Sequence, residues 1–176
     1  MNTYLRFFDY EKAFNYYCTL ILKMRQGSNC KSKSRIIAKP VLILSIIKLI
    51  EEGKSVNQFS YEELEATYKS IFGKYFIEAH QENLTPLSYP FYYMKTDQFW
   101  NLAWTNAEVK TEAPSATWIK KNTKYAYIDN ELWILLSHTT YRKKIIEFIL
   151  EEKIKKAFKG NNKGIFKTLL HLLMVV

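Results

Sequence analysis

Cysteine, glycine, proline and histidine are all scarce in this chain of 176 residues, which contains 2, 5, 4 and 3 of them respectively. The two cysteines, Cys18 and Cys30, cannot build a disulfide framework, and no His or Cys residues have the spacing of a zinc site. The few glycines and prolines favour helices, because all-β folds need many tight turns. The sequence therefore predicts a largely helical domain without a bound metal.

Long apolar stretches are missing as well. The longest aliphatic run extends from Val41 to Leu44 and continues through Ser45 to Ile47, far short of the ~20 residues that span a bilayer. Asp9 and Glu11 stand where a secretory signal peptide would be apolar. We therefore expect a cytoplasmic protein with no membrane partner.

The motifs of common catalytic sites are also absent from the sequence. It contains no Gly-rich phosphate loop and no G-x-S-x-G motif, and His80, His138 and His171 are too scattered to share a metal. Asp97 and Asp129 could serve a metal-dependent nuclease, but a turn and a helix cap explain them better. We expect no catalytic site and no cofactor. The alternative, a nuclease with an unrecognised site, is testable by plasmid cleavage.

Positive charge and aromatic side chains are abundant instead. The formal net charge is +9, and aromatic residues make up 16% of the chain. Excess positive charge attracts polyanions, chiefly nucleic acid or an anionic membrane face. Hydrophobic residues make up 48% of the chain, which suffices for one domain with a substantial core. The chain is too short for two such domains.

Apolar residues that recur every three or four positions indicate several helices. They predict helices at residues 4–25, 40–52, from 60 through at least 72, 129–136 and 140–158. Pro40 fits the first turn of its helix, Ser60 and Glu63 form a capping box, and Asp129 is an N-cap. The helix at 40–52 is apolar nearly all round, so it should lie buried at the centre.

Short aromatic segments indicate a small sheet. Residues 89–95 and 99–104 flank the plausible turn 96–98 and predict a β-hairpin, while residues 125–128 alternate as a third strand. The predicted fold class is therefore α+β: a mainly helical single domain with a small antiparallel β-sheet.

A basic loop is the first candidate binding element. The stretch from residue 31 to residue 39 contains four cations and no acidic residue. Such side chains neutralise phosphates and give an affinity that depends on salt and little on sequence. The predicted DNA-binding residues of this loop are Lys31, Lys33, Arg35 and Lys39.

The aromatic segment SYPFYYMK at residues 88–95 is the second candidate. It places five rings beside Lys95, and such rings can stack on bases or form an apolar pocket. We expect Phe91 and Phe99 to belong to the core. The residues predicted to be exposed and to bind DNA together with Lys95 are Tyr89, Pro90 and Tyr93.

Four segments follow one another in a particular order. They are KPVLILSIIKLIEEG at 39–53, the capped helix containing LEATY, YPFYYMKTDQFWNL at 89–102 and YAYIDNELWILL at 125–136, before a helix that opens with Arg142. In this order they resemble the N-terminal region of bacterial HNH-type restriction endonucleases, which includes sulfur-binding domains. The resemblance covers roughly residues 5–158 and rests on the order of these segments along the chain, since each segment alone is short.

The resemblance implies an α+β module that binds duplex DNA and recognises phosphorothioate modification. Tyr89 and Pro90 would help to line a shallow apolar cup for the backbone sulfur. Sulfur is larger, softer and more poorly hydrated than the oxygen that it replaces, so an apolar cup beside cations favours it. Ala38 stands where many relatives have a histidine before the Lys-Pro pair, and Gln98 stands where the family's turn usually contains glycine.

The resemblance does not extend to a nuclease, because residues 160–176 cannot hold an HNH domain. We expect residues 1–159 to form the DNA-binding domain and residues 160–176 to form an apolar tail or a truncated continuation. A separate nuclease or a second copy of the chain is a candidate partner. The apolar end, Leu169 to Val176, also motivates an alternative function, a protein-interaction or regulatory module whose basic charge is incidental.

Overall fold

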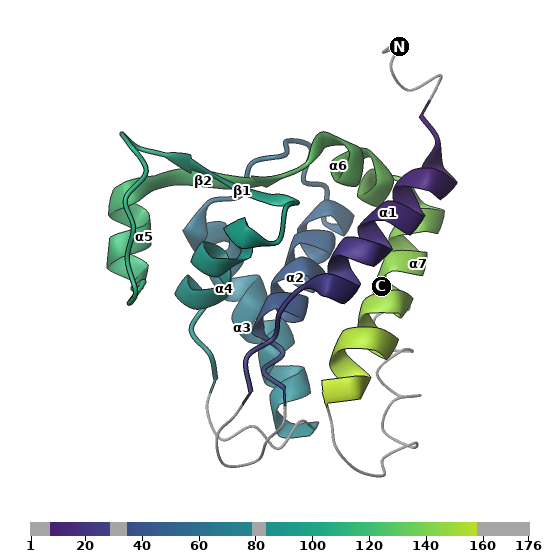
Figure 1. Cartoon of the computed structure of the whole chain (residues 1–176), viewed down its shortest axis with the longest axis horizontal. Helices are drawn as coiled ribbons and strands as arrows, with labels where there is room; N and C mark the ends of the chain where they lie inside the picture. The colour runs from purple at the N-terminus through teal and green to yellow at the C-terminus, as the bar shows by residue number, and fades with distance from the viewer. Residues whose placement is uncertain (1–7, 29–34, 79–83, 158–176) are drawn as a thin grey trace.

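The computed structural model describes residues 8–28, 35–78 and 84–157 (Figure 1). The elements are α1 (Tyr10–Lys23), α2 (Ala38–Glu51), α3 (Tyr61–Glu78), α4 (Ser88–Tyr93), η2 (Met94–Thr96), β1 (Trp100–Trp104), α5 (Ala116–Asn122), β2 (Thr123–Ile128), α6 (Asn130–Ser137), α7 (Thr139–Ile149), η3 (Leu150–Ile154) and η4 (Lys155–Ala157). The predicted α+β class is confirmed. None of the described helices has both the length and the apolar character needed to span a membrane.

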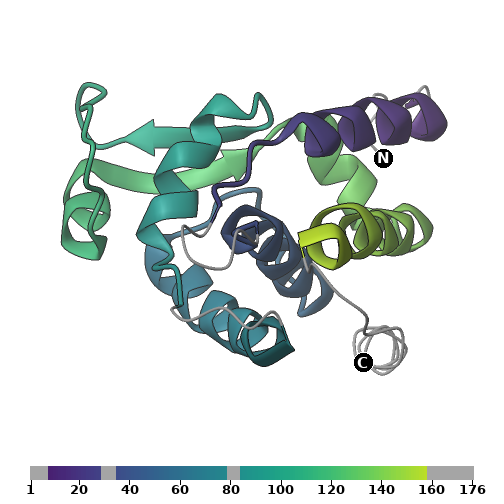
Figure 2. The same cartoon turned by 60° about the horizontal axis from the view of Figure 1, so that its bottom comes forward.

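Helix α2 is the centre of the fold, as its apolar sequence predicts. All residues from 40 to 47 are buried, and α3, α4, α6 and α7 contact this helix. Figure 2 shows α2 between α3 and α7, with α1 above them. Gly53 ends this segment with a φ of 99°, a left-handed conformation that glycine adopts without steric cost.

Ser60 and Asp129 both lie at the start of their helices, as predicted, but not all of the predicted capping hydrogen bonds form. The Ser60 hydroxyl accepts a hydrogen bond of 3.1 Å from the backbone N–H of Glu63, as predicted for the start of α3. The Glu63 carboxylate instead accepts from Lys54, at 2.7 and 2.8 Å. Asp129 is the N-cap of α6, but its side chain does not cap the helix and accepts from Tyr17 and Asn101.

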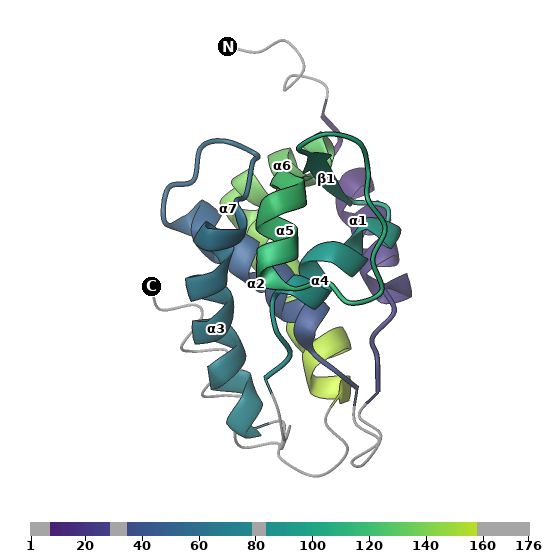
Figure 3. The ribbon, with the colours of Figure 1, turned by 90° about the vertical axis from the view of Figure 1, so that its left-hand side faces the viewer.

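The sheet has two antiparallel strands, β1 and β2, whose pairing runs from Trp100 opposite Ile128 to Trp104 opposite Thr123. Phe59 adds one bridge to β2 through two backbone hydrogen bonds with Ala126, of 2.7 and 2.8 Å. At the end of the sheet, α5 contacts both α3 and α4 (Figure 3).

The predicted hairpin is wrong in its first half. Residues 89–95 form α4 and most of η2, and β1 pairs with the strand predicted at 125–128. In α4, Phe91 and Tyr92 are both buried, and so is Met94, whereas a strand exposes alternate residues. Pro90 lies in the first turn of the helix, where its missing N–H costs little.

The last predicted helix is interrupted. Helix α7 continues into η3, a π-helical turn, and then into the 3₁₀ turn η4. A π turn inserts an extra residue into the helical repeat and rotates the side chains that follow it. Ile145, Ile149 and Ile154 are buried, while Phe148 is only partly buried.

Candidate nucleic-acid interface

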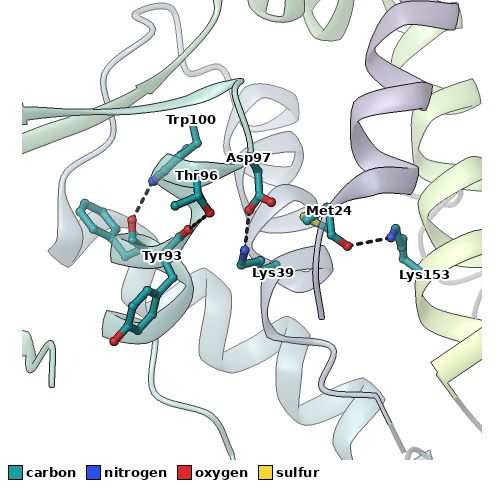
Figure 4. Close-up of polar contacts among 8 residues, drawn as sticks. Met24, Lys39, Tyr93, Thr96, Asp97, Trp100 and Lys153 are labelled. Carbon is teal, nitrogen blue, oxygen red and sulfur yellow. Dashed lines mark hydrogen bonds and ion pairs between the residues drawn. The ribbon is translucent and has the colours of Figure 1, made fainter. Parts of the chain in front are cut away.

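An ion pair joins the first turn of α2 to the end of η2. The Nζ of Lys39 lies 2.5 Å from Oδ2 of Asp97 (Figure 4), and the two side chains are 15% and 7% exposed. A pair this secluded from water interacts more strongly than an ion pair on the surface. The predicted phosphate ligand Lys39 therefore has an acidic partner within the protein.

A second lysine, Lys153, lies buried beside this pair. Its Nζ donates hydrogen bonds to the carbonyl oxygens of Leu22, at 2.7 Å, and Met24, at 3.0 Å. Figure 4 shows the bond to Met24. Burial lowers the pKa of Lys153, the charges of Arg35 and Lys39 lower this pKa further, and the charge of Asp97 raises it. The end of α1 and the beginning of α2 therefore share a cluster of positive charge.

Two cavities open beside this cluster. One, of about 600 Å³, is lined by Leu22, Lys23, Met24, Arg25, Gln26, Ser28, Arg35, Lys153, Lys156 and Ala157, and none of these described residues is acidic. The other, of about 380 Å³, is lined by Leu20, Lys23, Met24, Arg25, Thr96, Asp97 and Gln98. Both share Lys23 and Arg25. We call Lys23, Arg25, Arg35 and Lys156 the cationic rim, and such a concave array focuses positive potential.

Arg35 is placed in this rim by local pairing. Ser28 and Arg35 form an antiparallel bridge, and the Ile36 N–H donates to the carbonyl oxygen of Gly27 at 2.7 Å. Arg35 is exposed and takes part in interactions of its own. Lys31 and Lys33, the other two cations predicted for this loop, lie outside the described residues.

Helix α4 presents an aromatic pair next to α2. Tyr89 is 42% exposed, and its ring centroid lies 6.2 Å from that of Tyr93, which is partly buried. The Tyr93 hydroxyl donates to the backbone oxygen of Glu112 at 2.8 Å. The prediction of exposure is confirmed for Tyr89 and wrong for Pro90, which is buried because its helix packs against the core. Phe91 and Phe99 are buried, as predicted.

Lys95 is held by a different set of partners. Its Nζ lies 2.7 Å from Glu108 Oε1, 4.3 Å from the ring centroid of Tyr92 and 5.4 Å from that of Trp104. Burial lowers the pKa of Lys95, but hydrogen bonds to Glu108 and Tyr92 outweigh burial and raise this pKa overall. Lys95 would have to leave Glu108 in order to bind a phosphate.

No sequence pattern identifies two side chains that are important at this site. Lys153 lies near the end of the helix predicted at 140–158, where no pattern marks it as buried, yet the structure buries it within the π turn. Asp97 has the position of a turn residue, and nothing in its neighbourhood along the chain identifies Lys39, 58 residues away, as its partner.

The fold and the site define a class of protein: a mainly helical α+β domain with a concave cationic surface, which is the electrostatic footprint of a polyanion-binding module. The chain belongs to the ScoMcrA-like DNA sulfur-binding domain family, which it matches over residues 18–163. The resemblance found in the sequence is therefore confirmed.

Two solved structures share the fold. One is the sulfur-binding domain of SprMcrA complexed with phosphorothioated DNA, with a TM-score of 0.66 and 13% identity over 92% of this chain and 95% of that chain. The other is the sulfur-binding domain of ScoMcrA complexed with phosphorothioated DNA, with a TM-score of 0.62 and 13% identity over 90% of this chain and 98% of that chain. No curated protein matches the chain.

Proposed function

We propose that this chain is a DNA-binding module of the bacterial cytoplasm that recognises phosphorothioate-modified duplex DNA. The match to a DNA sulfur-binding family across residues 18–163 carries the proposal. The shared fold supports it, because both similar structures are described as complexes with phosphorothioated DNA. We assign DNA binding to residues 1–159 and treat residues 160–176 as a separate apolar tail.

The cationic rim would supply affinity that does not depend on base sequence. Its side chains, together with Lys31 and Lys33 from the basic loop, would neutralise backbone phosphates and release counterions. Lys95 would join them on the far side of α4 if its pair with Glu108 opens. This part of the interface would bind plain and modified DNA equally well.

The sulfur cup would form where α4 packs against α2. Tyr89 supplies an accessible ring, and Tyr93 lies beside it. Pro90 is buried and would form the wall of the cup from below, while Lys39 supplies the nearby cation. An apolar surface suits sulfur because sulfur loses less hydration than oxygen on burial.

The test measures binding of the full chain to two duplexes of identical sequence, one with a phosphorothioate in each strand, over a salt series. We expect steep salt dependence for both duplexes and tighter binding of the modified one. Tyr89→Ala should reduce the preference for sulfur by roughly fivefold or more, since about 1 kcal/mol of apolar contact is lost. The salt slopes should not change, because tyrosine neutralises no phosphate.

Tyr16→Ala is the matched control, because Tyr16 on α1 is also an exposed tyrosine, at 51% against 42% for Tyr89. It should leave both affinities unchanged. Equal binding of the two duplexes by the unaltered chain would reduce the function to plain DNA binding. No binding at low salt would exclude the nucleic-acid function altogether.

A further inference from the structure

Asp97 places a carboxylate next to the cationic rim, in which Lys156 pairs with a second carboxylate, that of Glu152. On one side Asp97 pairs with Lys39, and on the other it lines the cavity that contains Lys23 and Arg25. Its N–H donates to the Met94 carbonyl at 2.8 Å. The next residue, Gln98, has a φ of 67°, in the left-handed region that few side chains adopt readily. A tight turn therefore fixes the carboxylate beside Lys39.

This pair restricts what Lys39 can offer to a ligand. Lysine has three N–H donors, and one of them lies against Asp97 in a nearly buried setting. The carboxylate also cancels much of the positive charge of Lys39 at short range. A DNA backbone that approaches Lys39 therefore meets a lysine whose charge and donors are already partly used.

We propose that Asp97 is a specificity-determining residue: by pairing with Lys39, it makes the cup disfavour a phosphate oxygen more than a sulfur. The inference rests on the proposed function. An oxygen that enters an apolar cup loses strong hydrogen bonds to water and needs a protein donor in return. Sulfur accepts hydrogen bonds weakly, so it loses less on entry and gains less from a free lysine. The ion pair therefore raises the cost of binding mainly for unmodified DNA.

The deciding variant is Asp97→Asn, which keeps the shape of the side chain and removes its charge. The plain duplex should bind about tenfold more tightly, since Lys39 gains a charged hydrogen bond to oxygen. The phosphorothioate duplex should gain no more than about threefold, so the preference for sulfur falls. For the plain duplex, the slope of log affinity against log salt should steepen by about one phosphate contact.

Glu131→Gln is the matched control for charge, because Glu131 is an exposed carboxylate in the first turn of α6. It removes the same unit of negative charge from a different element and should leave the preference unchanged. If Asp97→Asn increases the affinity for both duplexes equally, the proposal is wrong and Asp97 acts only through general electrostatic repulsion of DNA. Unchanged affinities would overturn the proposal too.

Lys39→Gln alone is a poor probe, because it leaves the Asp97 carboxylate nearly buried and without its lysine, which destabilises folding. The double variant Lys39→Gln, Asp97→Asn avoids this problem. If the proposal is right, the gain of the plain duplex disappears in the double variant; if the gain persists without Lys39, the proposal is wrong. Asp97→Ala replaces Asp97→Asn should the asparagine fail to fold.

Failure of this inference differs from failure of the proposed function. The role of Asp97 alone is excluded if the unaltered chain prefers the phosphorothioate duplex and the Asp97→Asn variant keeps this preference. An unaltered chain without any preference excludes sulfur recognition itself.

Discussion

Lys153 illustrates how the protein accommodates a buried charge that no acidic side chain among the described residues contacts directly. Its ammonium group donates to the Leu22 and Met24 carbonyls at the end of α1, where the helix dipole places partial negative charge. Gln26 completes the junction by donating to the backbone oxygens of Ile36 and Lys153. The Lys153 side chain thus ties η3 to α1 beside the cationic rim.

Cys18, on the buried face of α1, gives a prediction for alkaline pH. Burial raises the pKa of its thiol from 9.0 to about 11. The unfolded thiol therefore ionises first as the pH rises, so the stabilising contribution of Cys18 is complete below about pH 9 and is lost as the pH rises to about 11. Over this interval the free energy of unfolding of the unaltered protein should fall by about 2 kcal/mol more than that of Cys18→Ala.

Urea unfolding of both proteins under reducing conditions, at about pH 8 and about pH 11, measures this difference. Comparing the two proteins removes the contribution of the other groups that titrate in this range. Equal losses of stability in the two proteins would show that the thiol ionises alike in the folded and unfolded states.

At the scale of the element, α3 depends on its first turn. The hydroxyl of Ser60 accepts from the Glu63 N–H, one of the N–H groups that a helix leaves without a partner at its start. Ser60→Ala should lower the free energy of unfolding by about 1 kcal/mol. Ser70→Ala, an exposed position in the interior of the same helix, should have little effect or stabilise slightly. Denaturant titration of the two variants measures both effects, and equal values would exclude a capping role for Ser60.

Helix α4 shows why the pattern of an element can mislead. Its aromatic residues predict a strand by composition, but a helix buries Phe91 and Tyr92 together, and the indole N–H of Trp100 donates to the Phe91 carbonyl at 2.7 Å. β1 satisfies its backbone hydrogen bonds with β2 instead. Residues distant in sequence thus decide the conformation of this segment.

At the scale of the whole molecule, the described residues share one hydrophobic core that includes side chains from α1 through η4. We therefore expect deletion of residues 160–176 to leave the free energy of unfolding and the DNA affinity unchanged. Calorimetry and the two-duplex binding assay test this expectation. The molecular mass in solution tests the alternative interaction function: a dimer that becomes monomeric on deletion would support it, and an unchanged mass would remove its main motive.

The amino-acid sequence alone predicted the features that depend on local patterns. The apolar character of residues 40–52 predicts a central helix, and Ser60 predicts the start of α3. The net charge predicts a polyanionic partner, and the ordered segments predict the family. These features follow from helix periodicity, capping and composition, which adjacent residues determine.

Only the tertiary structure decided the features that join distant residues. It turned residues 88–93 into a helix, buried Pro90 and turned Lys153 inward within a π turn. It also brought Asp97 to Lys39 across 58 residues of chain. Local propensity is weak compared with the burial of aromatic rings and the pairing of buried charges, and both depend on neighbours that only folding brings together.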